Sequence, residues 1–117
     1  MNVSDKINYV EFPATDITAT KRFFEKLFGW RFTDYGADYS AFSDAGLDGG
    51  FYKSDQCARQ DAGSALIVFY SDALDACPQR VIDAGGGIVK PIFEFPGGRR
   101  FHFHDPSGNE FAIWSDR

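Results

Sequence analysis

Two histidines near the end of the chain are the residues whose chemistry is easiest to name. His102 and His104 stand two residues apart in the stretch FHFHDPSGNEF, and Glu110 follows them. Imidazole nitrogens bind divalent ions, and a carboxylate can supply a third ligand. Imidazole also accepts and donates protons near neutral pH. Which chemistry is available depends on the direction in which the strand with the histidines faces.

The turn sequence DPSG predicts how this strand pairs with the next one. Pro106 suits the fixed φ of a type I turn, and Gly108 suits the left-handed residue that follows. Counting outward from this turn sets His104 opposite Glu110. Residues directly opposite one another in an antiparallel pair share a face of the sheet.

The same pairing sorts the hairpin onto two faces. The apolar face, which we expect under a helix, carries Phe101, Phe103, Phe111 and Ile113. The face expected to look into a cleft carries His102, His104, Glu110, Ala112 and Trp114. A shift of register by one residue would mix Phe and His on both faces, so the hydrophobic pattern favours this pairing. Alternating histidines are common as polar lining, and we favour that role, or a role as proton-transferring base, over metal binding.

The remaining sequence predicts two copies of one unit. Residues 5–53 form the first, with a strand INYVEF, a helix that begins after Asp16 and ends at Gly29, and three short strands. An exposed linker over 54–63 follows, because its sequence has no periodic apolar pattern.

Residues 64–117 repeat the order strand, helix and three strands. Pro78 fits best in the first turn of a helix, which favours Asp75 as its cap and a short helix near 76–84. The two halves match at an offset of about 57, and this match indicates an internal duplication: Val10 with Ile67, Phe12 with Phe69, Phe24 with Val81, Gly29 with Gly86.

The predicted fold class is therefore α+β, in a single domain over 1–117 built from two tandem βαβββ units. Neither unit offers enough core alone, so we expect each sheet to bury one face under its helix. The two sheets then lie side by side as a paired curved sheet, with their other faces around a shared cleft.

Composition narrows the class of partner. The formal charge is −5, with 12 Lys and Arg against 17 Asp and Glu, which disfavours nucleic acid and anionic lipid. We expect no membrane span and no signal peptide, and hence a cytoplasmic protein, because no apolar run approaches the required length. Cys57 and Cys77 have no metal-binding spacing and are expected as reduced thiols.

The stretches EFPATDITATKRFFEKLFGW and GGRRFHFHDPSGNEFAIW, within the duplicated unit, resemble the vicinal oxygen chelate superfamily. This group includes glyoxalase I, bleomycin resistance proteins and extradiol dioxygenases, and the chain looks most like small glyoxalase-related proteins. The resemblance covers nearly the whole chain. It implies a trough lined by eight strands and a homodimer in which units pair within one chain or across two.

The resemblance also implies where a metal ion would be held. Metal-using members have His or Gln early in the first strand of each unit, and Glu or His in the last strand. These positions fall at Tyr9 and Leu66, at Phe51 with an error of one residue toward Gly50, and at Ala112. Leu and Ala side chains offer no donor atom and a neutral phenol is a poor ligand, so we expect no metal and no other cofactor. This departure argues against lactoylglutathione lyase and dioxygenase activities, which rely on the ion.

Three functions stay open at this point. The first is metal-free binding of a small aromatic or cationic molecule by Tyr9, Glu11, Phe51, Glu110 and Trp114. Trp30 is a further candidate, although Trp30 and Phe51 would more often be core residues. The second is a lyase or isomerase that uses His102 or His104 as a base on a small oxygenated substrate, with no metal or with an ion relocated to His102, His104, Glu110 or Glu11. The third is a role in binding a partner protein with an idle cleft.

Overall fold

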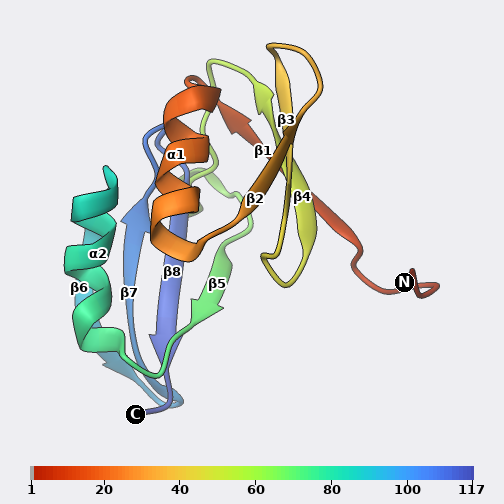
Figure 1. Cartoon of the computed structure of the whole chain (residues 1–117). Coiled ribbons are helices and arrows are strands. Elements are labelled where there is room, and N and C mark those ends of the chain that lie inside the picture. Colours follow the sequence, from red (N-terminus) through yellow and green to blue (C-terminus); the bar gives the residue numbers. More distant parts are fainter. Residues whose placement is uncertain (1) are drawn as a thin grey trace.

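The computed structural model describes residues 2–117 and shows two consecutive βαβββ units (Figure 1). The first unit comprises β1 (Tyr9–Ala14), α1 (Ile17–Phe28), β2 (Arg31–Asp34), β3 (Tyr39–Ser43) and β4 (Asp48–Lys53). A linker with the short helix η1 (Gln60–Ala62) follows. The second unit comprises β5 (Ile67–Tyr70), η2 (Leu74–Ala76), α2 (Cys77–Ala84), β6 (Gly87–Phe95), β7 (Gly98–His104) and β8 (Glu110–Ser115). The predicted α+β fold class and duplicated order are confirmed.

The two sheets have the same topology. The strand order is β1-β4-β3-β2 in one and β5-β8-β7-β6 in the other. In each sheet the first strand of the unit pairs in parallel with the last, and the other pairs are antiparallel. The first strands β1 and β5 each lie at a sheet edge, and Phe12 of one and Phe69 of the other line the same small cavity.

Helix α1 forms where the sequence predicts it and packs against both sheets. The carboxylate of Asp16 accepts a hydrogen bond from the amide of Ala19 at 3.0 Å, and Gly29 ends the helix with φ of 73°. The ring of Phe24 lies 5.7 Å from that of Phe51 in the first sheet. The ring of Phe23 lies 6.1 Å from that of Phe103 in the second. One aromatic core therefore serves both units, with α1 between the sheets (Figure 1).

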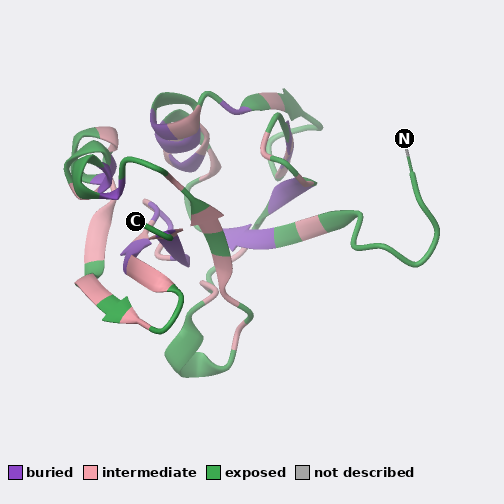
Figure 2. Ribbon diagram, turned by 90° about the horizontal axis from the view of Figure 1, so that it is seen from below, coloured by how far each residue is buried: buried purple, intermediate pink, exposed green. Residues whose placement is uncertain are grey.

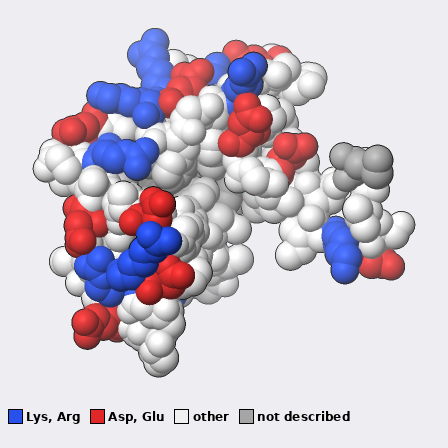
Figure 3. Space-filling model, turned by 60° about the horizontal axis from the view of Figure 1, so that its bottom comes forward, with Lys and Arg blue, Asp and Glu red and all other residues white. Residues whose placement is uncertain are grey.

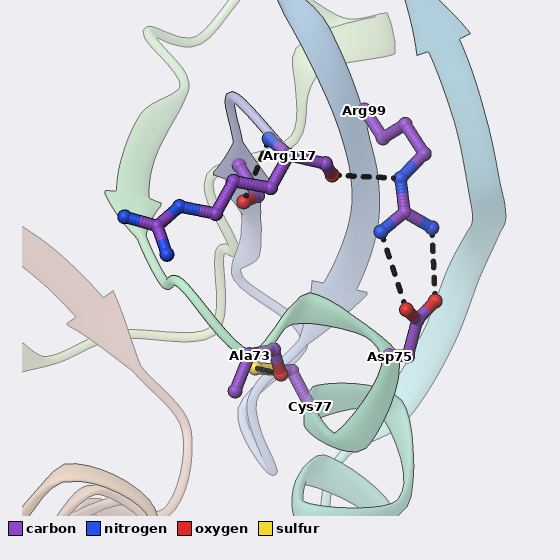
Figure 4. A network of polar contacts seen from close by, with 6 residues as sticks. Ala73, Asp75, Cys77, Arg99 and Arg117 are labelled. Carbon is purple, nitrogen blue, oxygen red and sulfur yellow. Dashed lines mark hydrogen bonds and ion pairs between the residues drawn. The ribbon is translucent and has the colours of Figure 1, made fainter.

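The second helix begins differently from the prediction. Residues 74–76 wind into η2, so Asp75 lies within a helical turn instead of before one, and no side chain caps α2. The Asp75 carboxylate instead accepts two hydrogen bonds from Arg99, at 2.9 and 3.2 Å. The Nε of Arg99 donates to the backbone oxygen of Arg117 at 3.0 Å (Figure 4). The cap prediction for Asp75 was wrong, and the residue tethers β7 to the start of the helix.

The β7–β8 hairpin has the predicted turn and register. The amide of Gly108 donates to the carbonyl of Asp105 at 3.0 Å, and Gly108 adopts φ of 90°. His104 lies opposite Glu110 and His102 opposite Ala112. The predicted apolar face is buried on the helix side, as its exposed fractions of at most 1% show: Phe101, Phe103, Phe111 and Ile113.

The turn of this hairpin also holds the first unit. The amide of the Asn109 side chain donates to the carbonyl of Pro13 at 2.7 Å. The hydroxyls of Thr20 and Ser107 share a hydrogen bond of 2.7 Å. The carboxylate of Asp105 accepts hydrogen bonds from the backbone amides of Ser107 and Asn109. Burial raises the pKa of Asp105 to about 6, although these hydrogen bonds act to lower it. The turn is therefore a buried connection between units.

The surface differs in character from this interior. Residues 2–8 extend away from the body of the protein and are exposed along their length (Figure 2). Lysine and arginine side chains alternate with aspartate and glutamate over the face shown in Figure 3, without a patch of one sign. Neither α1 nor α2 is long and apolar enough to cross a membrane within residues 2–117.

Candidate functional site

Each sheet has two faces, of which one packs on the shared core and the other faces away from it. We call the face away from the core the inner face of the sheet, because it is the face expected to line the cleft. The registers place the following residues on the first inner face: Tyr9, Glu11, Tyr39, Gly50 and Tyr52. They place the following on the second: Val68, Tyr70, Phe93, Arg100, His102, His104, Glu110, Ala112 and Trp114. The histidines face away from the helices, as the sequence predicts.

A hydrogen-bonded chain of two phenols and a carboxylate crosses the first inner face. The hydroxyls of Tyr9 and Tyr39 lie 2.5 Å apart, and the hydroxyl of Tyr39 donates to Glu11 at 2.9 Å. Burial, followed by the hydrogen bonds with Tyr9 and Glu11, raises the pKa of Tyr39. Tyr39 therefore stays a neutral donor that holds the Glu11 carboxylate in place.

The sequence analysis missed Tyr39, although its spacing carried a signal. Phe42 on β3 lies in the core, so the strand alternation places Tyr39, three residues earlier, on the opposite face. The proposed ligand residues Tyr9 and Glu11 do lie together, and Tyr39 joins them.

Phe51 does not line the cleft. It is 0% exposed, and its ring lies 5.5 Å from Phe12 and 5.7 Å from Phe24 in the core. The parallel register pairs Phe12 with Phe51 and Glu11 with Gly50, so Gly50 is the inner position of β4. The prediction for Phe51 was therefore displaced by one residue.

Gly50 and Trp30 complete this part of the site. A Cβ atom on Gly50 would overlap the ring of Tyr39, which occupies the space of a side chain there. Trp30 is 6% exposed and stacks between Phe24 at 4.3 Å and Phe42 at 4.4 Å. Trp30 is thus a core residue.

The four inner positions where the resemblance implies metal ligands hold a phenol, a glycine and two alkyl side chains: Tyr9, Gly50, Leu66 and Ala112. The one phenol oxygen is already bonded to Tyr39. Across residues 2–117, no three His, Cys, Asp or Glu side chains gather closely enough to hold an ion. Because the four residues at the implied positions offer one neutral phenol oxygen among them, they do not fit the divalent ion of the family.

His102 and Glu110 form a buried pair on the second inner face. His102 is 0% exposed, Glu110 is 7% exposed, and Nδ1 of the imidazole lies 2.7 Å from Oε2 of the carboxylate. The backbone amide of Gln60 in the linker donates to the other carboxylate oxygen at 3.2 Å. Ala112, opposite His102, is small, which leaves room for the imidazole to reach along β8 to Glu110. In a neutral imidazole, the tautomer that donates from Nδ1 to this carboxylate has its lone pair on Nε2.

His104 lies opposite Glu110 but bonds elsewhere, and Trp114 lies further along β8. Nδ1 of His104 is 2.9 Å from the carbonyl of Asp105, and the half-buried ring lines a small pocket of about 230 Å³ beside Val89. Trp114 packs edge-on against Tyr70, with ring centres 5.3 Å apart. The predicted site residues are therefore distributed over two inner faces instead of one cluster.

A larger pocket, of about 640 Å³, lies where the two units meet. Its walls come from β1, β4, the linker and the start of β5, and they include Val10, Glu11, Phe12, Pro13, Tyr52, Asp55, Gln56, Cys57, Ala58, Ala62, Ser64, Ala65 and Ile67. Two carboxylates, Glu11 and Asp55, are part of this lining, and none of its residues is a lysine or an arginine. The electrostatic character of the pocket is therefore negative.

Sequence comparisons identify relatives of the chain. A sequence model of the Glyoxalase/Bleomycin resistance protein/Dioxygenase superfamily matches residues 6–113. The anthracycline biosynthesis protein DnrV of Streptomyces peucetius is 32% identical over 117 residues, which cover 85% of this chain and 42% of DnrV. The protein CFP32 of Mycobacterium tuberculosis is 27% identical over 115 residues, which cover 92% of this chain and 44% of CFP32. The chain thus spans less than half the length of these relatives.

Solved structures share the fold. A glyoxalase/bleomycin resistance protein/dioxygenase family enzyme from Burkholderia phytofirmans superposes with a TM-score of 0.79 at 19% identity, over 96% of this chain and 99% of that one. The fosfomycin resistance protein FosX of Listeria monocytogenes superposes with a TM-score of 0.78 at 20% identity, over 97% and 94% of the two chains. Together with the family model and the likeness to DnrV, these matches show that the chain belongs to the glyoxalase/bleomycin resistance protein/dioxygenase superfamily.

Proposed function

We propose that the protein binds a small aromatic cation in the pocket between its two units, without a divalent metal ion. The observation that carries this proposal is the lining of the 640 Å³ pocket, which includes Glu11 and Asp55 but no lysine or arginine. A negative pocket of this size favours a cationic ligand over an anionic one.

The first inner face supplies the second part of the argument. Tyr52, in the lining, is 39% exposed, and Tyr9 is 44% exposed. Their rings are thus open to a ligand beside the carboxylate of Glu11. Each contact of a cation with an aromatic face contributes roughly 0.5–2 kcal/mol. Because Tyr39 holds the Glu11 carboxylate in one position, less side-chain entropy is lost when a ligand binds.

The names of the relatives agree with an organic ligand. The family includes bleomycin resistance proteins, and DnrV is named for anthracycline biosynthesis. On this proposal the protein acts in the cytoplasm as a homodimer, in which a second copy covers part of the exposed inner faces. Supporting this, several large apolar residues are exposed on or beside β1 and β5: Ile7, Tyr9, Val68 and Tyr70. Light scattering coupled to size-exclusion chromatography measures the oligomeric state.

Calorimetric titration with phenyltrimethylammonium tests the binding proposal. Glu11→Gln removes the charge with little change of shape, and we expect the affinity to fall about tenfold, since a charged contact is lost. Glu94→Gln is the matched control, because Glu94 is an exposed residue of β6 outside the pocket. Anisole supplies a neutral aromatic probe without a hydroxyl group and should bind more weakly than the cation.

Two results would contradict the proposal. One is equal affinity for the cation and for anisole. The other is loss of cation binding after treatment with EDTA, which would mean that a metal ion takes part in binding.

A second candidate function is a lyase or isomerase reaction on a small oxygenated substrate. The observation that favours it is the buried pair of His102 and Glu110, because a carboxylate on one imidazole nitrogen prepares the other to accept a proton. A measured metal content near one equivalent per chain in the purified protein would support this candidate over metal-free binding.

A further inference from the structure

Two buried polar atoms of the second inner face have no hydrogen-bond partner. They are Nε of Arg100 and Nε2 of His102, the two such side-chain atoms among residues 2–117. Both residues lie on β7, two positions apart, and face the same side of the sheet. An unpaired buried polar group destabilises the folded protein and is rare. Two such groups on one face of β7 are free to bond to a polar ligand.

The chemistry of the two atoms is complementary. When the imidazole of His102 is neutral and donates from Nδ1 to Glu110, its Nε2 has a lone pair that needs a donor. The Nε–H group of Arg100 is a donor that needs an acceptor. A hydroxyl group is both donor and acceptor, and therefore matches the chemistry of both atoms.

The surroundings of the two atoms are aromatic. The guanidinium of Arg100 lies over the rings of Phe93 and Phe95, at 5.4 and 5.5 Å. The ring of Phe93 is 5.7 Å from that of His102, and the ring of Phe95 is 6.3 Å from that of Trp114. Phe93, Phe95 and Trp114 are only half-buried, so parts of their ring faces are open on this side of the sheet.

We propose that the second inner face binds an aromatic hydroxyl compound, whose O–H group donates to Nε2 of His102 and accepts from Nε of Arg100. The ring of the ligand packs against Phe93, Phe95 and Trp114. This site is separate from the cation pocket between the units, because none of these residues is part of the lining of that pocket.

The site also supports a proton transfer. The hydroxyl proton moves to Nε2 of His102 while the electron pair of the O–H bond stays on the ligand oxygen. The products are an imidazolium, stabilised by Glu110, and a phenolate, stabilised by Arg100. No other bond changes, and no further reactant is needed.

Access to the site runs past Phe93. His102 is fully buried beneath this ring, so the ring must move aside for a ligand to reach Nε2. The strand that carries it is irregular, because the pairing of β6 with β7 shifts register between Ile88 and Lys90 and again between Lys90 and Phe93. Interrupted pairing lowers the cost of displacing this part of β6.

The test uses 4-nitrophenol, because its phenolate absorbs visible light and its phenol form does not. We expect the protein to bind it and to raise the phenolate fraction of the bound probe. His102→Phe and Arg100→Met should each weaken binding about tenfold or more. His104→Gln is the matched control, because His104 is the neighbouring imidazole on the same face but bonds to a backbone carbonyl. It should bind like the unaltered protein.

Further variants separate this site from loss of folding and from the cation pocket. Arg100 is half-buried, so its variant should keep the circular dichroism spectrum and thermal midpoint of the parent. Phe93→Ala should speed association in stopped-flow absorbance, since it uncovers Nε2. Glu11→Gln, which weakens cation binding, should leave 4-nitrophenol binding unchanged.

The proposal is overturned if folded Arg100→Met or His102→Phe protein binds 4-nitrophenol as tightly as the parent. It is also overturned if a crystal soaked in the probe shows only a water molecule at Nε2. In that case the unpaired atoms belong to a structural water site.

Discussion

The two units share one backbone plan but have different inner faces. Gly50 in the first unit and Ala112 in the second occupy equivalent places on their last strands, and both are small. The ring of Tyr39 fills the space over Gly50, while the imidazole of His102 lies opposite Ala112 and bonds to Glu110. The space beside the small residue thus holds an exposed network of two phenols and a carboxylate in one unit, and a buried pair of imidazole and carboxylate in the other. Duplication sets where side chains point, whereas their chemistry diverges freely.

The largest expected effect tests whether the two units share one core. Phe111 contacts Phe12 and Phe24 of the first unit as well as Phe103 of the second, with ring centres 5.1, 5.3 and 5.6 Å away. Phe111→Ala should lower the free energy of unfolding by about 3–5 kcal/mol, because it leaves a cavity between the units. Urea unfolding followed by circular dichroism measures the change.

Val68→Ala is the control for Phe111, since Val68 is 42% exposed and should change stability little. Both units should lose structure together. Two separate transitions in the Phe111 variant would show that each unit has a core of its own.

The second prediction compares the turns that precede the last strands. Asp105, in the second unit, is 0% exposed, and burial raises its pKa from 3.8 to about 6. The unfolded chain releases this proton at lower pH than the folded chain does. The stability that Asp105 contributes is therefore complete below about pH 4, and roughly 2–3 kcal/mol is lost as the pH rises through about 6.

Denaturant unfolding at several pH values between 3.5 and 7.5, roughly spanning both pKa values, measures this loss. Asp105→Asn should remove that part of the pH dependence, because Asn does not titrate. Asp44→Asn is the control in the first unit, where the side chain is 63% exposed. An unaltered pH profile in the Asp105 variant would show that another group is responsible.

The third prediction concerns the first inner face. In Gly50→Ala the new Cβ overlaps the ring of Tyr39, so the ring must leave its place and release Glu11. We expect a loss of about 1–2 kcal/mol in stability and severalfold weaker binding of phenyltrimethylammonium. Combining Gly50→Ala with Tyr39→Ala removes the overlap and should restore stability. If the single variant kept full cation affinity, Tyr39 would not position Glu11 for binding.

The smallest effect is expected at the tether between Arg99 and Asp75 (Figure 4). The Asp75 side chain is 77% exposed, and exposed ion pairs contribute little. Arg99→Ala should shift the thermal midpoint by less than about 2 °C. The thermal midpoint of the variant should depend on salt concentration no more than that of the parent does. A larger shift would mean that this contact, on the outer end of the second sheet, is needed to order α2.

Much of the fold was predictable from local patterns. The turn DPSG and the alternation of Phe and His were enough to predict the register of β7 and β8, because one residue of slip exchanges the faces. The displaced prediction for Phe51 has an equally local cause. Both residues before it are glycines, which have no side chains to show the alternation of β4. Only the pairing with β1 decides that Gly50 is the inner residue.

The sequence by itself determined the duplicated βαβββ order and which residues of each strand share a face, because backbone geometry repeats over a few residues. The tertiary structure decided which of those side chains meet. The linker bonds to Glu110 through the amide of Gln60, and Glu110 pairs with His102, not with its opposite neighbour His104. The first of these contacts joins residues 50 apart in the chain and the second joins residues 8 apart, and both form because buried polar groups must find partners.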